Sequence, residues 1–166
     1  MEATYQDDSY AGLLLVFGDG ARLDTWRPGS TVEVEQFEFD EPMAGSQELQ
    51  GPAASHPRGS GERAPGTHSS SQRDLFERRL EQHRVVFVRE VAGKCLAVAR
   101  ERGWPLVLVL GDPHLTAPAA EVLRHGGVEV EQSNRILGWK THHELALAVG
   151  PDVERALHEH AARAAR

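Results

Sequence analysis

Histidine, the commonest metal-binding side chain, occurs nine times in this sequence, but not in the spacings that a metal site requires. The sequence contains no His-x-x-x-His and no Cys-x-x-Cys motif. His142 and His143 are adjacent, and one residue separates His158 from His160, so neither pair lies on one face of a helix. We therefore expect no metal site and assign the histidines to helix caps and to the surface.

The other candidates for catalysis are one thiol and two carboxylates. Cys95 falls among apolar residues of a long helical pattern, where a thiol is normally an inert part of the core. Asp19 and Asp112 each follow a predicted strand, and a carboxylate at the carboxyl end of a strand can serve catalysis or bind a metal. A metal-dependent nuclease would need the two carboxylates to converge, which the sequence does not indicate. We expect ordinary turn roles for both.

The charge of the chain is distributed unevenly. A net charge of −7 argues against nucleic acid as a partner. Residues 1–50 contain eleven acidic and two basic residues, a balance of −9, whereas residues 51–166 have a balance of +2. The downstream arginines that could form a local basic surface are Arg73, Arg78, Arg79 and Arg84. The alternative is a solvated helix face on which these arginines pair with Asp74, Glu77 and Glu81.

The elements that must position these side chains begin with an antiparallel meander. Strands are predicted over 13–17, 21–26 and 31–39, with Gly18-Asp19-Gly20 forming the first tight turn. The third strand alternates apolar residues with glutamates, which indicates one solvent-exposed, acidic side. Its apolar positions change from even to odd near Gln36, and this change predicts a bulge.

A long helix is expected after a segment that has no strong pattern of its own. Residues 40–70 are rich in Gly, Pro and Ser and are interpreted as a mobile loop within a single domain over 1–166. The helix is predicted over 72–102, with Ser71 and Asp74 as a shortened capping box. Such a helix would be roughly 45 Å long. Because this exceeds the width of a small sheet, its first turns should project beyond the core.

The C-terminal third alternates strands and helices. Residues 106–110 are all apolar and predict a central strand covered on both faces. A helix over 116–124 and a strand over 128–131 follow. Thr141 and Glu144 fit a capping box that opens a helix to about residue 148, and Gly150 and Pro151 predict a separate last helix. The order of elements indicates the α/β class, with helices packed on a mixed sheet.

Several classes of protein are disfavoured. The longest apolar run, 13–17, is too short to span a membrane, and the acidic N-terminus does not resemble a signal peptide. One cysteine excludes an internal disulfide. No strand is followed by a glycine-rich phosphate loop, so we expect no nucleotide cofactor. These observations together favour the cytoplasm.

One string of the long helix resembles a known family. Residues 76–93 are similar to the long helix of the central domain of archaeal and eukaryotic class I peptide-chain release factors. The positions that match are Phe76, Arg78, Arg79, Phe87, Val88, Arg89, Val91 and Ala92. Residues 106–115 resemble the next strand and the start of the following helix of that domain. Bacterial relatives, including peptidyl-tRNA hydrolases of ribosome quality control, share this layout. The resemblance covers most of 11–149 and implies a ribonuclease H-like fold.

The resemblance also implies a catalytic residue. The loop before the long helix carries Gly-Gly-Gln in this family, or a looser Gly-x-x-Gln, and its Gln positions water against the peptidyl-tRNA ester. The corresponding residues here are Ser69-Ser70-Ser71-Gln72, so Gln72 matches the catalytic Gln while serines replace the glycines. Glycine suits a thin backbone that enters between RNA surfaces, and a fixed amide orients water. The alternative interpretation of Gln72 is the first residue of a capped helix.

Two functions from different classes follow. The resemblance implies a translation-associated protein that acts at the ribosomal large subunit and hydrolyses peptidyl-tRNA, with ribosomal RNA bound by Arg73, Arg78, Arg79 and Arg84. The alternative is a catalytically inactive stress or hibernation factor that binds the ribosome, which the serines in place of glycine favour. The codon-reading and partner-binding domains of release factors have no counterpart in the 166 residues, so we do not transfer stop-codon recognition. The oligomeric state is left open.

Overall fold

The computed structural model describes residues 9–40, 67–137 and 140–166 of the chain. The strands and helices, in chain order, are β1 Ala11–Val16, β2 Gly20–Arg27, β3 Ser30–Glu38, α2 Thr67–Arg102, β4 Leu106–Leu110, α3 Pro113–His125, β5 Glu129–Ser133 and α4 His142–Ala164. None of the described helices combines the length and hydrophobicity needed to cross a lipid bilayer.

The five strands form one mixed sheet in the order β3-β2-β1-β4-β5. β1 pairs antiparallel with β2 and parallel with β4, and β4 pairs parallel with β5. All residues of β1 and β4 are buried, as expected for central strands covered on both faces. This order, with an antiparallel N-terminal meander and a helical crossover from β3 to β4, is the ribonuclease H-like arrangement. The predicted fold class is therefore confirmed.

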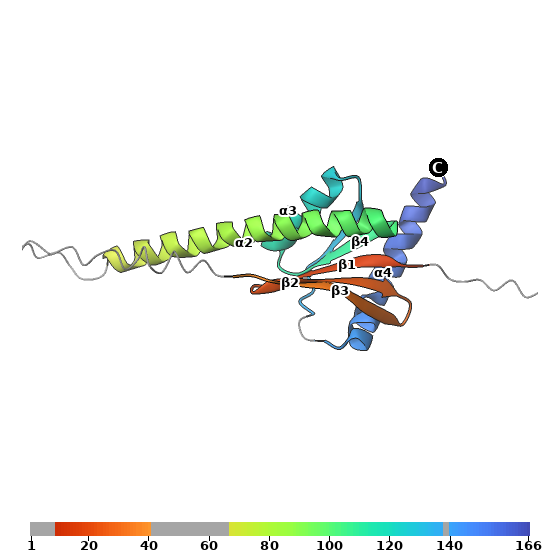
Figure 1. The fold of residues 1–166 in the computed structure, drawn as a ribbon, viewed down its shortest axis with the longest axis horizontal. Coiled ribbons are helices and arrows are strands. Elements are labelled where there is room, and N and C mark those ends of the chain that lie inside the picture. The colour runs from red at the N-terminus through yellow and green to blue at the C-terminus, as the bar shows by residue number, and fades with distance from the viewer. Residues whose placement is uncertain (1–8, 41–66, 138–139) are drawn as a thin grey trace, which may run out of the picture.

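Helices cover both faces of the sheet (Figure 1). One apolar cluster joins the sheet to α2 and α3, through side chains such as Val91, Cys95 and Leu123. The other joins the opposite face to α4, through Leu145 and Val149. The long helix therefore contributes only its C-terminal part to the first cluster.

The bulge in β3 redirects its side chains from one face of the sheet to the other. Leu23 pairs with Glu35 and Asp24 pairs with Glu33, which leaves Val34 as the extra residue. Before the bulge, the Thr31 hydroxyl donates a hydrogen bond to the backbone oxygen of His142 at the start of α4. Beyond the bulge, β3 joins the cluster that contains α2. The predicted bulge is confirmed, two residues before Gln36.

The start of α2 differs from the prediction. The helix begins at Thr67, five residues before the expected start at Gln72. Residue 71 therefore lies inside the helix, and the capping box expected from Ser71 and Asp74 is wrong. Residues 67–70, expected in a mobile loop, are helical, and the rest of that loop, 41–66, lies outside the described residues.

The C-terminal segment is one helix and not two. α4 continues through Gly150 and Pro151, so the prediction of a break there is wrong. Proline removes one backbone hydrogen bond, but the apolar face of the helix continues in phase on both sides, at Val149 and Val153. Burial of that face against the sheet outweighs the local cost. The capping box of Thr141 and Glu144 is confirmed, with both of its hydrogen bonds present.

Candidate functional site

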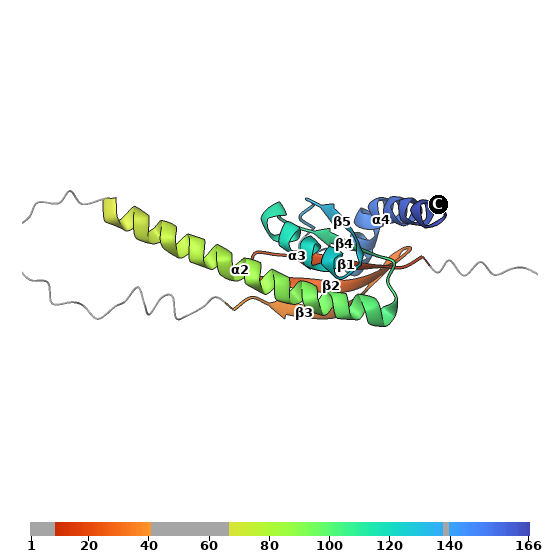
Figure 2. The same cartoon turned by 90° about the horizontal axis from the view of Figure 1, so that it is seen from above.

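The N-terminal part of α2 extends away from the sheet (Figures 1 and 2). We call residues 67–87 the arm, because Val88 is the first buried side chain of the helix among those described. At 1.5 Å per residue the arm is roughly 30 Å long. The expectation that the first turns of this helix project beyond the core is confirmed.

Gln72, the predicted catalytic residue, lies on the arm and is exposed to solvent. It is the sixth residue of α2, so its backbone is helical. The expectation that it ends a loop is wrong, and it is not the first residue of the helix either. Serines in place of glycine remove the conformational freedom that opposes helix formation, and the segment continues the helix instead.

The four predicted RNA-binding arginines separate into two groups. Arg73, Arg78 and Arg79 are exposed on the arm. Five positions separate Arg73 from Arg78, which turns their side chains by about 140° around the helix. The structure therefore distributes these three around the arm and does not collect them on one face.

Arg84 lies at the base of the arm and is partly buried. Its guanidinium carbon is 6.0 Å from the centre of the Phe39 ring, within cation–π distance. The ring of Phe39 also packs against Phe87, with their centroids 5.3 Å apart. Residues just after β3 thus contact α2 where the arm meets the sheet.

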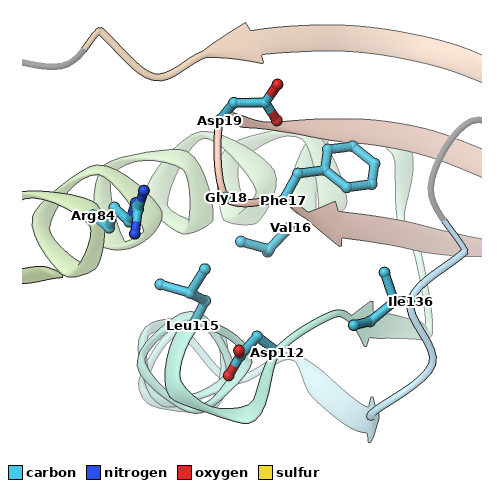
Figure 3. A pocket seen from close by; sticks show the side chains of 8 residues that line it. All are labelled: Val16, Phe17, Gly18, Asp19, Arg84, Asp112, Leu115 and Ile136. Carbon is cyan, nitrogen blue, oxygen red and sulfur yellow. The ribbon is translucent and has the colours of Figure 1, made fainter.

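Arg84 also lines a cavity of about 550 Å³ next to the carboxyl ends of β1 and β4 (Figure 3). The remaining lining residues are Val16, Phe17, Gly18, Asp19, Asp112, Leu115 and Ile136. The structure therefore brings Asp19 and Asp112 to one cavity, which the sequence analysis missed. The signal was available, because parallel neighbouring strands end at the same edge of a sheet. Asp112 also caps α3, since its carboxylate accepts a hydrogen bond from the backbone N–H of His114 at 2.9 Å.

The other candidate groups take structural roles. The Cys95 thiol is buried, and burial raises its pKa to about 12. Nδ1 of His142 lies 2.9 Å from Nη2 of Arg22 and 3.1 Å from the hydroxyl of Thr31. Across 9–40, 67–137 and 140–166, no three His, Cys, Asp or Glu side chains are grouped to hold a metal ion.

Comparison with known proteins gives a family match over almost the whole chain. The model of bacterial archaeo-eukaryotic release factor family 10 matches residues 2–166. No curated protein matches the sequence. The crystal structure of the archaeal translation termination factor aRF1 is similar over 96% of this chain and 43% of that chain, with 11% identity and a TM-score of 0.41. A structure described as an archaeal protein gives 96% and 42% coverage, 11% identity and a TM-score of 0.40.

The chain spans less than half the length of both of these solved structures. The family match, by contrast, covers both the arm and the sheet. The match identifies a release-factor-like domain, and it supports a translation-related function. The chain belongs to bacterial archaeo-eukaryotic release factor family 10.

Proposed function

We propose that this protein binds the large subunit of the ribosome through the arm. The observation that carries the proposal is that Arg73, Arg78 and Arg79 are exposed on a helical segment that extends beyond the sheet. Family membership supports a translation-related role. The partners are then ribosomal RNA and peptidyl-tRNA, and the compartment is the cytoplasm.

The distribution of charge supports the arm as the contacting part. The whole chain has a net charge of −7, but residues 72–87 carry four arginines against three carboxylates. Arginines on different sides of a narrow helix can contact phosphates on both walls of an RNA crevice. Such contacts position a protein without reading the sequence of the RNA. Binding should therefore weaken steeply as the salt concentration rises.

Co-sedimentation with purified ribosomes and separated subunits at several salt concentrations tests this proposal. The wild-type protein should pellet with the large subunit at low salt. Arg73→Gln/Arg78→Gln/Arg79→Gln should bind more weakly and should lower the slope of log affinity against log salt by about 2. The matched control changes three exposed arginines outside the arm, Arg27→Gln/Arg89→Gln/Arg166→Gln, and should retain the wild-type slope. Equal losses in both triple variants, or no binding by the wild type, would refute the role of the arm.

Hydrolysis of the peptidyl-tRNA ester is the second candidate function. The exposure of Gln72 near the N-terminal end of the arm favours it, because its side-chain amide can reach a substrate. Its helical backbone favours a non-hydrolytic role instead. A helix is about 10 Å wide and cannot approach an ester between RNA surfaces as closely as the thin backbone of a glycine loop can. Binding without hydrolysis, as in a stress or hibernation factor, is therefore the function that the geometry supports best.

A single-turnover assay on ribosomes that carry peptidyl-tRNA separates the two candidates. If the protein is a hydrolase, Gln72→Ala should lower the rate by at least about tenfold while ribosome binding is unchanged. Gln82→Ala provides the matched control, because Gln82 is also exposed on the arm. A wild-type rate no higher than the background, together with firm binding, assigns the non-hydrolytic role.

A further inference from the structure

The cavity beside the arm is not explained by ribosome binding. It lies at the carboxyl ends of two parallel strands, β1 and β4, the edge at which open α/β sheets commonly bind ligands. Its volume of about 550 Å³ falls in the usual range for small-molecule sites. Apolar side chains, among them Val16, Leu115 and Ile136, form part of the wall.

Arg84 supplies a positive charge to this wall. Its Nε atom is buried and has no hydrogen-bond partner within the described residues. An unsatisfied buried donor is costly, and the guanidinium carries further donors on its Nη atoms. The face of Phe39 is its described contact, and a ring face cannot neutralise the charge. A ligand with an anionic oxygen would satisfy this guanidinium.

Two carboxylates lie across the same cavity from each other, as Figure 3 shows for Asp19 and Asp112. One oxygen of Asp112 caps α3, which leaves its other oxygen for a second donor. Asp19 lies in the turn between β1 and β2 and is exposed. The cavity therefore offers one cationic and two anionic groups.

We propose that this cavity binds a small basic amino acid. Such a molecule has one carboxylate for Arg84 and two cationic groups for Asp19 and Asp112, so its charges complement those of the cavity one for one. Neither a purely anionic nor a purely cationic ligand achieves this. Its aliphatic chain would pack on the apolar wall. The site uses Arg84 at the base of the arm, whereas Arg73, Arg78 and Arg79 are the exposed arginines whose substitution tests RNA binding.

Isothermal titration of the full chain with L-arginine and with L-lysine tests the proposal. At least one of them should bind with a stoichiometry of one per chain. Agmatine lacks the carboxylate of L-arginine, and L-citrulline lacks its side-chain charge. Each analogue should bind about tenfold more weakly than L-arginine, because each loses one charged hydrogen bond. Absence of saturable binding at millimolar concentrations, or equal binding of L-arginine and agmatine, would overturn the proposal.

Variants then assign the contacts. Arg84→Gln should abolish the preference for L-arginine over agmatine while leaving agmatine binding unchanged. Asp19→Asn should weaken L-arginine binding about tenfold, and its exposed position in a turn makes it a variant that folds. Asp112→Asn should do the same, since asparagine retains the cap of α3. The control Arg89→Gln changes an exposed arginine of the same helix and should bind as the wild type does. If Arg84→Gln keeps the preference, or Asp19→Asn binds normally, the assignment is wrong.

Discussion

The guanidinium carbon of Arg84 lies 6.0 Å from the centre of the Phe39 ring, and this contact connects the end of the meander to the base of the arm. Phe39 packs at the same time against Phe87 of α2. Three side chains from two distant parts of the sequence therefore meet where the helix leaves the sheet. The contact lies at the base of the arm, in which no described side chain is fully buried.

Phe39→Ala should loosen the base of the arm. The loss of one aromatic pair and one cation–π contact should lower the free energy of unfolding by about 1 to 2 kcal/mol. Amide hydrogen exchange should rise around residues 84–90 more than in β4. Val32→Ala truncates a β3 side chain that is 59% exposed and should change neither quantity. An unchanged exchange rate in Phe39→Ala would show that the arm is held by other contacts.

The sequence was sufficient for the elements whose patterns are set by burial. The all-apolar run of β4 and the alternation in β3 each report which faces are covered, and both strands were predicted correctly. Errors arose where local signals compete with packing. Gly150 and Pro151 are helix-breaking residues in isolation, but the buried face of α4 continues across them.

The site was less predictable than the fold, because it is formed by residues that are far apart in the sequence. Asp19 and Asp112 are 93 positions apart and meet because β1 and β4 are parallel neighbours. In the sequence, Arg84 cannot be distinguished from Arg78 and Arg79. Only the structure shows that Arg84 is partly buried and lines the cavity, whereas the other two are exposed on the arm. The catalytic role of Gln72 and the RNA-binding roles of the arginines remain predictions.

A buried ion pair on β2 should be sensitive to the loss of either partner. The Asp24 side chain has no exposed area. Its two carboxylate oxygens accept hydrogen bonds from the Arg22 guanidinium, Oδ1 from Nε at 2.7 Å and Oδ2 from Nη2. Arg22→Met should lower the free energy of unfolding by about 3 kcal/mol or more, because an unpaired charge remains buried. Urea denaturation measures this loss.

The double variant Arg22→Met/Asp24→Leu is the control for that experiment, because it removes both charges. It should recover much of the stability lost in Arg22→Met, since an apolar pair of similar volume leaves no buried charge. If the double variant is as unstable as the single one, packing around Arg22 is the dominant contribution and the charge is not. Nδ1 of His142, at the start of α4, lies 3.8 Å from Oδ2 of Asp24. Removal of the Asp24 carboxylate in the double variant should therefore also make the start of α4 less ordered.

The Cys95 thiol should resist alkylation and should act as a reporter of unfolding. Burial raises its pKa from 9.0 to about 12, so the reactive thiolate is scarce in the folded state at neutral pH. Labelling at pH 8 should therefore follow the opening of the core and accelerate in urea. Rapid labelling without denaturant would contradict the buried environment.

The same shift predicts a loss of stability in alkali. Because the folded pKa is the higher one, the unfolded chain loses its proton first, and stability falls as the pH rises from about 9 towards 12. Cys95→Ala lacks the ionisable group and should lose less stability over this range. Comparing the slopes of unfolding free energy against pH for the two proteins isolates the contribution of the thiol.

The capping box of α4 gives the last prediction. The Thr141 hydroxyl accepts a hydrogen bond from the Glu144 backbone N–H, and the Glu144 carboxylate accepts one from the Thr141 backbone N–H. Thr141→Ala should lower the free energy of unfolding by about 1 kcal/mol. The bond from the Thr141 backbone lowers the pKa of Glu144, so the benefit of its charge is present at neutral pH and is lost as the pH falls below the pKa of a free glutamate. Glu144→Gln should remove this acid dependence, whereas Glu154→Gln, on an exposed turn of the same helix, should retain it. Acid titrations of stability that are identical in the wild type and Glu144→Gln would show that the cap does not depend on charge.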